Sequence, residues 1–444
     1  INYLYQNYNG YGNGTGRNGT FYFESLSDDQ VGKWGSDVSF NTWPSNVTPG
    51  TSSVWNATYT VLRTCNQIIA GVEASSLANS VKGHYIGQAK LNRAWQYYDL
   101  VRHYGDVPLV LVPLNVDSPE LYGARTNRNT VMDQVLEDLD YAIANITTKA
   151  AKTEFSVDLA WAMKAEICLF EASFAKYHQK DNTRANKFYN EVIKAYDALN
   201  GSYERFETYG MIYNSTLKAA DGIPSLTANK EVIFMKPYAM GTFCNSISKY
   251  TSTNSYTLGM SKDAFDSYLF TDGKPLASTT CNKTDVGVIT TTDEGSEHLN
   301  IENLLEVRDA RLAATIDPYI VYTGYTWSRP NSDGLQSTSG YGVRKFTNPN
   351  LPKYYNTTDN QGYLCAPLYW MAEIYLAYAE AKAELGTLTD TDLDNTLNKL
   401  WARANIPAQT VASLNAIADP ANNMGVSSLI YEIRRCRRAE LMMD

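Results

Sequence analysis

The chain has 444 residues, of which 44% are hydrophobic, and it carries a formal net charge of -9 with a pI near 5.1. A chain of this length can bury a large core. The acidic balance argues against a surface that binds nucleic acid, since counterion release from phosphates requires clustered Lys and Arg. The one dense basic run is Arg434, Arg435, Arg437 and Arg438. We expect these arginines to pair with acidic neighbours on a helix near its C-terminal end.

Tyrosine is the unusual residue in the composition, with 33 Tyr against 13 Phe. Its ring is apolar and its hydroxyl is polar, which suits surfaces that are both apolar and wet, such as carbohydrate and peptide clefts. Seams between packed helices use the same residue. We expect most of the tyrosines to serve packing and a small number to contact a ligand.

The six cysteines lie far apart and show no C-x-x-C spacing, which argues against a zinc site or a thioredoxin-like motif. Cys65 and Cys168 fall in helical patterns and are expected to be buried. Cys244 and Cys281 fall in a loop-rich stretch, and the sequence leaves open whether they form a disulfide.

The acidic run of Asp390, Asp392 and Asp394 imitates the start of a calcium-binding EF-hand loop. Asn395 stands where the loop requires Gly, so the pattern does not fit. Acidic residues at the N-terminus of a helix are the better interpretation. The sequence therefore predicts no metal site.

No apolar run approaches the roughly 20 residues of a membrane span. Ile1 is not an initiator methionine, and the last helical pattern runs to Asp444 without a Gly or Pro stop. We therefore expect both ends to be truncated and any anchor to lie outside this sequence.

The first elements in chain order are a polar segment and two helices. Residues 1–20 are rich in Gly, Asn and Tyr without a period, which predicts an irregular surface segment. Apolar residues from Trp55 to Val72 recur at helical spacing, and a second helix follows a short polar link. We expect the two helices to pack antiparallel.

The second helix is the most informative stretch of the chain. Its apolar positions from Leu91 to Val101 predict a core side, while Arg93 and its polar neighbours at residues 96, 99 and 102 are expected on the other faces. Gly105 can close the helix in a left-handed cap, and Pro108 cannot continue it. We expect the apolar residues 109–112 to be strand-like.

Two further helical pairs follow the same plan. Thr130 can cap a helix that runs to Ile146. The spacing of apolar residues over 159–170 and 188–196 predicts the next helix pair, which ends at Gly201. Near the C-terminus, residues 368–385 predict a helix that Gly386 ends, with a partner helix over 393–404. Paired antiparallel helices of this kind stack into a superhelix in tetratricopeptide repeats, because one pair cannot bury its apolar faces alone.

Residues 202–365 differ from the helical parts in being rich in Gly, Ser, Thr, Asn and Pro. Short pieces such as 232–235 and 287–289 predict strands. Connections this long usually carry function, so we expect the binding surface here. The predicted fold is mainly α, with tetratricopeptide-like helix pairs forming a superhelical scaffold beside a loop-rich region with short strands.

The run from Leu91 to Val110 resembles the R-A-x-x-Y-x-x-L-V-x-x-Y-G-D-V-P-L motif of the SusD/RagB family of outer-membrane nutrient-binding lipoproteins. Six further segments resemble family motifs in the same order: Glu231-Val232-Ile233-Phe234, Asp272-Gly273-Lys274-Pro275, Arg308-Asp309-Ala310-Arg311-Leu312, Gly342-Val343-Arg344-Lys345-Phe346, Ala372-Glu373-Ile374-Tyr375-Leu376 with Ala379-Glu380-Ala381, and Ile433-Arg434-Arg435 with Arg437-Arg438-Ala439-Glu440-Leu441. Ala310 replaces the usual proline, and Cys436 stands where acidic residues are usual. The matches cover about residues 55–444.

The resemblance implies four tetratricopeptide-like helix pairs in a single domain over residues 1–444. The helical scaffold would cover about 52–200 and 366–444, and the loop-rich ligand-binding region about 202–365 plus 1–50. It also implies a surface-exposed protein at the outer membrane that captures an oligosaccharide and passes it to a SusC-like, TonB-dependent transporter. The lipidated N-terminal cysteine of the family is absent here, so the lipid anchor is expected outside this chain.

Sugar binding requires flat aromatic faces and side chains that hydrogen-bond hydroxyls, and it requires no cofactor, metal or catalytic base. Tryptophans outside helical patterns are the best candidates, whereas those in helices are expected in the core. Trp327 is grouped with Tyr325 and Arg329 in a Gly- and Ser-rich loop. The other predicted ligand-binding residues are Trp34, Asp37 and Trp43.

Two alternatives remain. The first is a peptide-binding uptake protein similar to RagB, since loop tryptophans would serve either ligand. The second is a glycoside hydrolase on an α-helical toroid, which would work with two carboxylates about 5 to 10 Å apart. Its candidates are Asp28, Asp29 and Asp37, or Asp293 and Glu294, but such acidic pairs in loops are usually solvated surface. We expect binding without catalysis.

Overall fold

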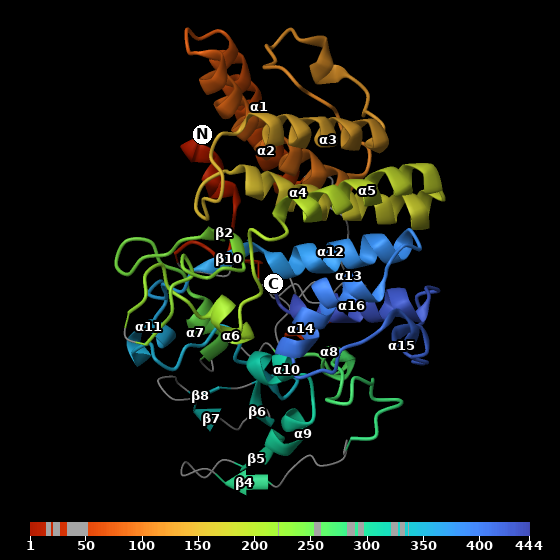
Figure 1. The fold of residues 1–444 in the computed structure, drawn as a ribbon. Helices are drawn as coiled ribbons and strands as arrows, with labels where there is room; N and C mark the ends of the chain where they lie inside the picture. Colours follow the sequence, from red (N-terminus) through yellow and green to blue (C-terminus); the bar gives the residue numbers. More distant parts are fainter. Residues whose placement is uncertain are drawn as a thin grey trace. The chain divides into compact units, whose positions relative to one another are not determined.

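The computed structural model describes residues 1–14, 19–20, 27–32, 52–220, 222–252, 259–281, 289–291, 297–320, 327–328, 334–335 and 337–444. This chain divides into two compact units (Figure 1). The first consists of Ile1–Tyr8 and Val47–Ser202, and the second of Asn9–Asn46 and Tyr203–Asp444. The single domain expected from the sequence stays a prediction.

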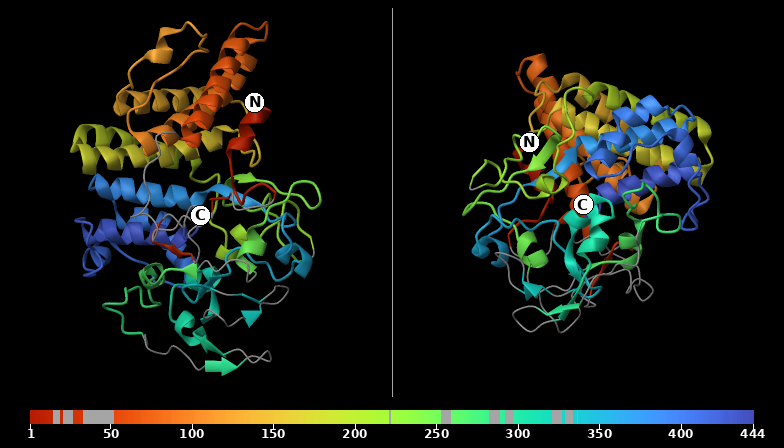
Figure 2. Two further views of the ribbon diagram at one scale, coloured as in Figure 1. Left: turned by 180° about the vertical axis from the view of Figure 1, so that it is seen from behind. Right: turned by 60° about the horizontal axis from the view of Figure 1, so that its bottom comes forward.

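The first unit is built from paired helices, as predicted. They are α1 (Ser53–Glu73), α2 (Asn79–Tyr104), α3 (Arg128–Asn145), α4 (Val157–Phe174) and α5 (Asn182–Leu199), with short helical turns η1 (Asn2–Asn7), η4 (Pro119–Tyr122) and η5 (Ala175–Gln179). Helix α2 packs against α1 and α3, and α4 packs against α5. From behind, α4 and α5 again run side by side (Figure 2).

The expected surface position of Arg93 is wrong. Its side chain is buried between helices, where the guanidinium donates to both carboxylate oxygens of Asp138 on α3 at 2.7 and 2.8 Å. A third nitrogen donates to Asn66 Oδ1 of α1 at 2.9 Å and to the Leu111 carbonyl at 3.2 Å. Helical periodicity classes Arg as polar, but a buried partner makes it a core residue. Arg93 therefore ties three elements together.

The sequence located the end of α2 correctly and the next residues incorrectly. Gly105 takes a φ of 71°, in the region that favours glycine, and ends the helix as predicted. Residues 109–112 form no strand. The Val110 carbonyl instead accepts hydrogen bonds from Asn66 and Tyr97, so helical side chains rather than a neighbouring strand satisfy this backbone.

Two predicted helix ends differ slightly from the structure. Asn127, rather than Thr130, caps α3 by accepting from the Asn129 backbone N–H, and the helix begins at Arg128. Helix α5 ends at Leu199, and Gly201 follows with a φ of 85°. Both Asn and Thr can cap, so sequence alone places such ends only approximately.

The second unit contains a further set of packed helices. They are α12 (Met371–Glu384), α13 (Asp390–Asn395), α14 (Leu397–Arg403), α15 (Val411–Asn415) and α16 (Ser428–Glu440). The helix predicted from Leu368 begins at Met371 because strand β10 (Ala366–Trp370) precedes it and pairs antiparallel with β2 (Val232–Lys236). Thr389 and Asp392 form a reciprocal capping box at the start of α13, which confirms the helix N-terminus predicted for the acidic run.

The loop-rich part of the second unit has short elements, as expected. They are β1 (Gln30–Val31), α6 (Tyr209–Tyr213), α7 (Ile247–Ser252), β3 (Gly259–Met260), α8 (Lys262–Ser267), β4 (Ile289–Thr291), β5 (Glu297–Asn300), α9 (Glu302–Glu306), α10 (Ala310–Thr315), β6 (Ile316–Ile320), β7 (Trp327–Ser328), β8 (Gly334–Leu335), β9 (Tyr341–Val343) and α11 (Lys353–Thr357). Six of the strands form one sheet in the order β1-β3-β9-β6-β5-β4. The fold is thus mainly helical with a few short strands, as predicted.

The arginines near the C-terminus pair with acidic side chains, which confirms the sequence interpretation. Arg434 and Arg437 both bind Glu380 of α12 at 2.9 Å. Arg438 donates to Asp29 at 2.6 Å, and Arg435 lies in an ion pair with Glu432 at 3.0 Å. The basic run therefore fastens α16 to its neighbours.

All six cysteines are free thiols, and Cys65 and Cys168 are buried as expected. Burial raises the pKa of the Cys65 thiol to about 12, so it is protonated at neutral pH. Of the helices in the described part of the chain, none combines the length and the apolar composition that crossing a membrane requires.

We predict that Asp138→Ala lowers the free energy of unfolding by about 3–5 kcal/mol, because it leaves the buried Arg93 guanidinium without its carboxylate. Asp99 pairs with the exposed Arg102 on the same helix and supplies the control, for which Asp99→Ala should cost at most about 1 kcal/mol. Urea unfolding followed by circular dichroism measures both. Equal costs would contradict a structural role for the Arg93–Asp138 pair.

Candidate ligand-binding site

Most of the ligand-binding residues predicted from the sequence lie outside the described residues. These are Trp34, Asp37, Trp43, Tyr325 and Arg329. The backbone of Trp327 lies in β7 and pairs with Leu335 of β8. The predicted site around this loop therefore stays a prediction.

The described loops of the second unit contain an aromatic platform, formed by Tyr238 and Phe243. The chain turns back between Ala239 and Phe243, which exchange backbone hydrogen bonds at 2.8 and 3.0 Å. The two rings stack with centroids 5.2 Å apart and an angle of 6° between their planes. Tyr238 is buried, whereas Phe243 is 43% exposed. Phe243 thus presents a flat, partly exposed ring that is backed by a buried one.

A segment from the N-terminal part of the chain, Asn9–Gly14, crosses this platform and is here called the strap. The Tyr238 hydroxyl donates to the Gly12 carbonyl at 2.5 Å, and the Gly14 N–H donates to the Cys244 carbonyl at 3.1 Å. Gly10 has a φ of 50°, and a Cβ there would lie 3.0 Å from the Ala366 Cβ. Because only glycine tolerates both conditions, the strap can lie directly on the strands below.

Lys236, the last residue of β2, contacts both the strap and the platform. Its ammonium group donates to the Asn9 carbonyl at 3.1 Å and to Asn13 Oδ1 at 2.6 Å. The same nitrogen lies 5.7 Å from the centre of the Tyr238 ring and 5.5 Å from that of Phe243. These distances are within the range of cation–π attraction.

A second loop runs beside the platform and adds polar groups. Asn245 and Gly362 exchange backbone hydrogen bonds at 2.8 and 3.0 Å, which places residues 359–363 next to the turn. The Ser246 hydroxyl lies within hydrogen-bond distance of both the Gly14 carbonyl and the Asp359 carboxylate, so the loop is also fixed to the strap. Asn13 is exposed, and Asn360 is half-buried with its Oδ1 3.9 Å from the position that a Cβ on Gly14 would take. Amide side chains of this kind can bind hydroxyl groups.

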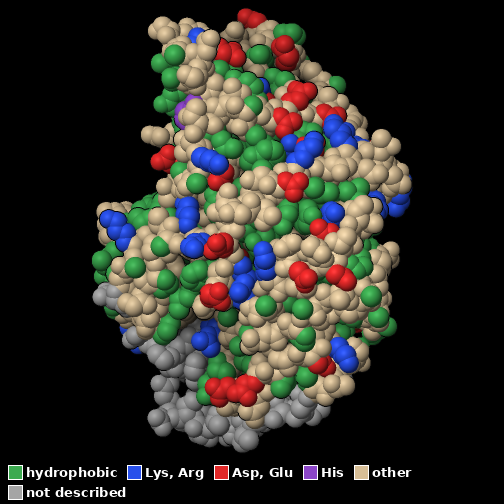
Figure 3. Space-filling model, in the orientation of Figure 1, with side chains coloured by type: hydrophobic (Ala, Val, Ile, Leu, Met, Phe, Trp, Pro, Cys, Tyr) green, Lys and Arg blue, Asp and Glu red, His purple; other side chains and the backbone are tan. Residues whose placement is uncertain are grey.

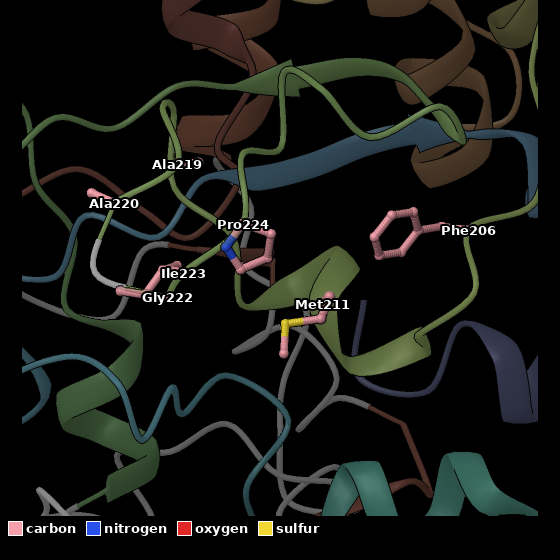
Figure 4. A pocket seen from close by; sticks show the side chains of 7 residues that line it. All are labelled: Phe206, Met211, Ala219, Ala220, Gly222, Ile223 and Pro224. Carbon is pink, nitrogen blue, oxygen red and sulfur yellow. The ribbon is translucent and has the colours of Figure 1, made fainter.

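The same unit has an apolar hollow of about 610 Å³. It is lined by Phe206, Met211, Ala219, Ala220, Gly222, Ile223 and Pro224. Phe206 lies on one side and residues 219–220 and 222–224 on the other, with Met211 of α6 between them (Figure 4). None of these lining side chains carries a charge or a strong hydrogen-bonding group, so only backbone groups could bind the hydroxyls of a sugar there.

Charged groups in the second unit are mainly tied into the scaffold. Asp29, a candidate of the hydrolase alternative, binds Arg438 at 2.6 Å, while Asp293 and Glu294 lie outside the described residues. Among the described residues, no group of three or more His, Cys, Asp or Glu side chains is placed to hold a metal ion. On the face drawn in Figure 3, acidic and basic side chains are interspersed.

From the sequence, Tyr325 was the one tyrosine among the candidate ligand-binding residues, and neither Tyr238 nor Phe243 stood out. The available signal was Pro237-Tyr238 directly after a predicted strand, followed by Gly241 and Phe243. Gly241 has a φ of 73°, as a tight turn requires. Two aromatic residues flanking such a turn can meet on one side of it, but the sequence does not show which of them is exposed.

Comparison with known proteins gives consistent matches. Residues 225–444 match the SusD family, and residues 2–169 match a family described as starch-binding and associating with the outer membrane. A SusD-like protein of Formosa agariphila is 23% identical over 167 residues, which are 37% of this chain and 31% of that protein. The matched stretch therefore spans about a third of this curated relative.

Solved structures show the same fold. A SusD-like carbohydrate-binding protein from Bacteroides fragilis superposes with a TM-score of 0.71 and 20% identity, covering 100% of this chain and 82% of that one. A laminarin-binding SusD-like protein superposes with a TM-score of 0.59 and 19% identity, covering 99% and 86%.

We predict that Tyr238→Ala lowers the free energy of unfolding by about 3–5 kcal/mol, because it empties a buried site beneath the strap. Phe243→Ala removes a half-exposed ring and should cost about 1 kcal/mol or less. Thermal and urea unfolding of the two variants provide the comparison. A loss for Phe243→Ala as large as that for Tyr238→Ala would mean that Phe243 is a core residue.

Proposed function

Because the chain belongs to the SusD/RagB family, whose described members are carbohydrate-binding proteins, we propose that it binds an oligosaccharide on the aromatic platform of Tyr238 and Phe243. The observation that supports this proposal best is the half-exposed Phe243 ring, stacked on a buried ring and bordered by the strap. A pyranose presents a flat face of C–H groups that fits such a ring. Trp327 remains a second candidate for stacking, as the sequence predicts.

The platform is suited to binding because its parts are held in place before a ligand arrives. Hydrogen bonds from Tyr238 and Ser246 fix the strap, and the Asn245–Gly362 pairing fixes the neighbouring loop. A preorganised surface loses less conformational entropy on binding than a mobile one. The amides of Asn13 and Asn360 would then contact the sugar hydroxyls.

The proposed activity is binding without cleavage. The described family members are carbohydrate-binding proteins, and no catalytic family is among the matches. Cleavage of a glycosidic bond would require two carboxylates flanking the sugar. Near the platform, the described acid Asp359 instead accepts from Ser246 and lies 3.8 Å from Lys249. Assay of new reducing ends after incubation with candidate polysaccharides tests this part, and their release would contradict it.

We further propose that the protein acts at the surface of the outer membrane and passes its ligand to a SusC-like, TonB-dependent transporter. The description of the matched family as associating with the outer membrane supports the location. A lipid anchor outside this chain would hold the protein there. The solved relatives described above bind carbohydrate, which favours an oligosaccharide over the peptide alternative.

A glycan array that includes laminarin oligosaccharides, followed by calorimetry on the best ligand, tests the proposed site. Phe243→Ala should weaken binding at least tenfold, about 1.4 kcal/mol, because the sugar loses its stacking surface. Tyr122→Ala is the matched control, since Tyr122 is 87% exposed and lies in the first unit. Unchanged affinity in Phe243→Ala would remove the platform from the site, and Trp327→Ala then tests the predicted loop.

A further inference from the structure

We propose that Lys236 is a positioning residue for the aromatic platform, and that the strap must leave its place for the Lys236 ammonium group to reach water. The proposal rests on the proposed role of Phe243 in binding only where it concerns ligand affinity. Its structural part concerns the strap alone. Lys236 would therefore couple the position of the strap to that of the Phe243 ring.

The geometry shows that Lys236 contacts three parts of the site at once. Its ammonium group donates to the strap at Asn9 and Asn13, and it lies at nearly equal distances from the two platform rings. Its aliphatic stem lies under Gly10, where a Cβ would be 3.1 Å from Lys236 Cδ. Movement of the strap would therefore change the surroundings of the whole side chain.

The strap covers a side chain that would otherwise reach water. Lys236 is only 7% exposed although it is the last residue of β2 and lies beside a turn. The residue opposite it in the sheet is Ala366, whose small side chain leaves room for the lysine stem. Removal of the strap would take away the two acceptors Asn9 O and Asn13 Oδ1 and expose the ammonium group.

The electrostatics give this arrangement a pH dependence with a defined sign. Burial lowers the pKa of Lys236 to about 8, whereas an exposed lysine titrates near 10.4. The folded arrangement therefore disfavours the protonated form. The closed strap becomes more stable as pH rises through 8, until the exposed lysine also loses its proton.

Of the other titratable groups that face Lys236, two buried phenols and one buried thiol keep their protons in this range. Burial raises the pKa of Tyr238 and of Tyr11 above their ordinary values, and it raises the pKa of the Cys365 thiol to about 11. Asp359 and Lys249 of the neighbouring segments lie near each other at 3.8 Å. The free Cys244 thiol, which lies in the turn and contacts the Ala239 carbonyl at 3.5 Å, also faces the strap. A response between pH 7 and 9 can therefore be assigned to Lys236 where replacing the lysine abolishes it.

Hydrogen exchange of the full chain without ligand tests the proposal. Peptides covering residues 9–14 should show protection, corrected for intrinsic exchange, that rises roughly tenfold from pH 7 to pH 9, because the pKa of Lys236 is about 8 in the closed arrangement and near 10.4 when exposed. Lys236→Met, which keeps the stem and removes the charge, should abolish this rise. Lys249→Met is the matched control and should retain it.

Ligand affinity supplies a second readout. Lys236→Met should weaken oligosaccharide binding by roughly threefold to tenfold, because the strap and the Phe243 ring lose their common contact. Its melting temperature should stay near that of the wild type, since replacing a buried charge by an apolar side chain is often neutral for stability. A purely structural lysine would instead lower the melting temperature and leave the affinity of the remaining folded protein unchanged.

The two proposals fail in different ways. Protection that is constant from pH 7 to pH 9 in the wild type, or that still rises in Lys236→Met, would overturn the role of Lys236 whatever the ligand does. Binding that is unaffected by Phe243→Ala would overturn the platform as the ligand site. If Lys236→Met does not fold, the pH dependence of protection in the wild type still tests the role of Lys236.

Discussion

A chain of buried ion pairs in the second unit is the constraint on which its other parts depend. Asp309 binds Arg311 at 2.6 Å, Arg311 binds Glu440 at 2.8 Å, and Arg403 bridges Glu440 and Glu231, the latter at 2.7 Å. All five side chains are at most 1% exposed. Burial raises the pKa of Glu231, yet its carboxylate still accepts from Arg403 and from a backbone N–H. Removing Arg311 would leave Asp309 without its ion-pair partner, and removing Arg403 would do the same to Glu231. The network therefore holds α10, α14, α16 and the start of β2 in one arrangement.

The same residues explain why the sequence revealed the scaffold better than the site. Glu231, the Arg308–Leu312 segment and Glu440 belong to the motifs that resemble the SusD/RagB family, and in the structure they form the buried network. Arg93 of the opening motif likewise binds Asp138 in the core. Helix pairs could be predicted because the spacing of apolar residues shows which face of a helix packs. The burial of Arg93 could not be predicted from its own helix. A charged residue is buried only where another element supplies its partner, here Asp138.

The proposed ligand site depends on contacts between segments that are far apart in sequence. In the sequence, Phe243 looks like an ordinary loop phenylalanine. Only the fold places Tyr238 beneath it and residues 9–14 beside it. Gly10 permits that close approach, and Lys236 binds the strap from below. The contacts of the strap with Tyr238 and Lys236 join residues more than 200 positions apart, so composition could indicate the loop-rich region but not the ring within it. Buried charges thus fix the helices, and the strap fixes the proposed ligand-binding surface.

A crystal structure of this chain with an oligosaccharide that it binds in solution would test the platform most directly. We predict a sugar ring lying flat against Phe243, with hydroxyl groups bound by the amides of Asn13 and Asn360 and with the strap still in place over Lys236. A sugar bound elsewhere, with the Phe243 ring left facing solvent, would contradict it.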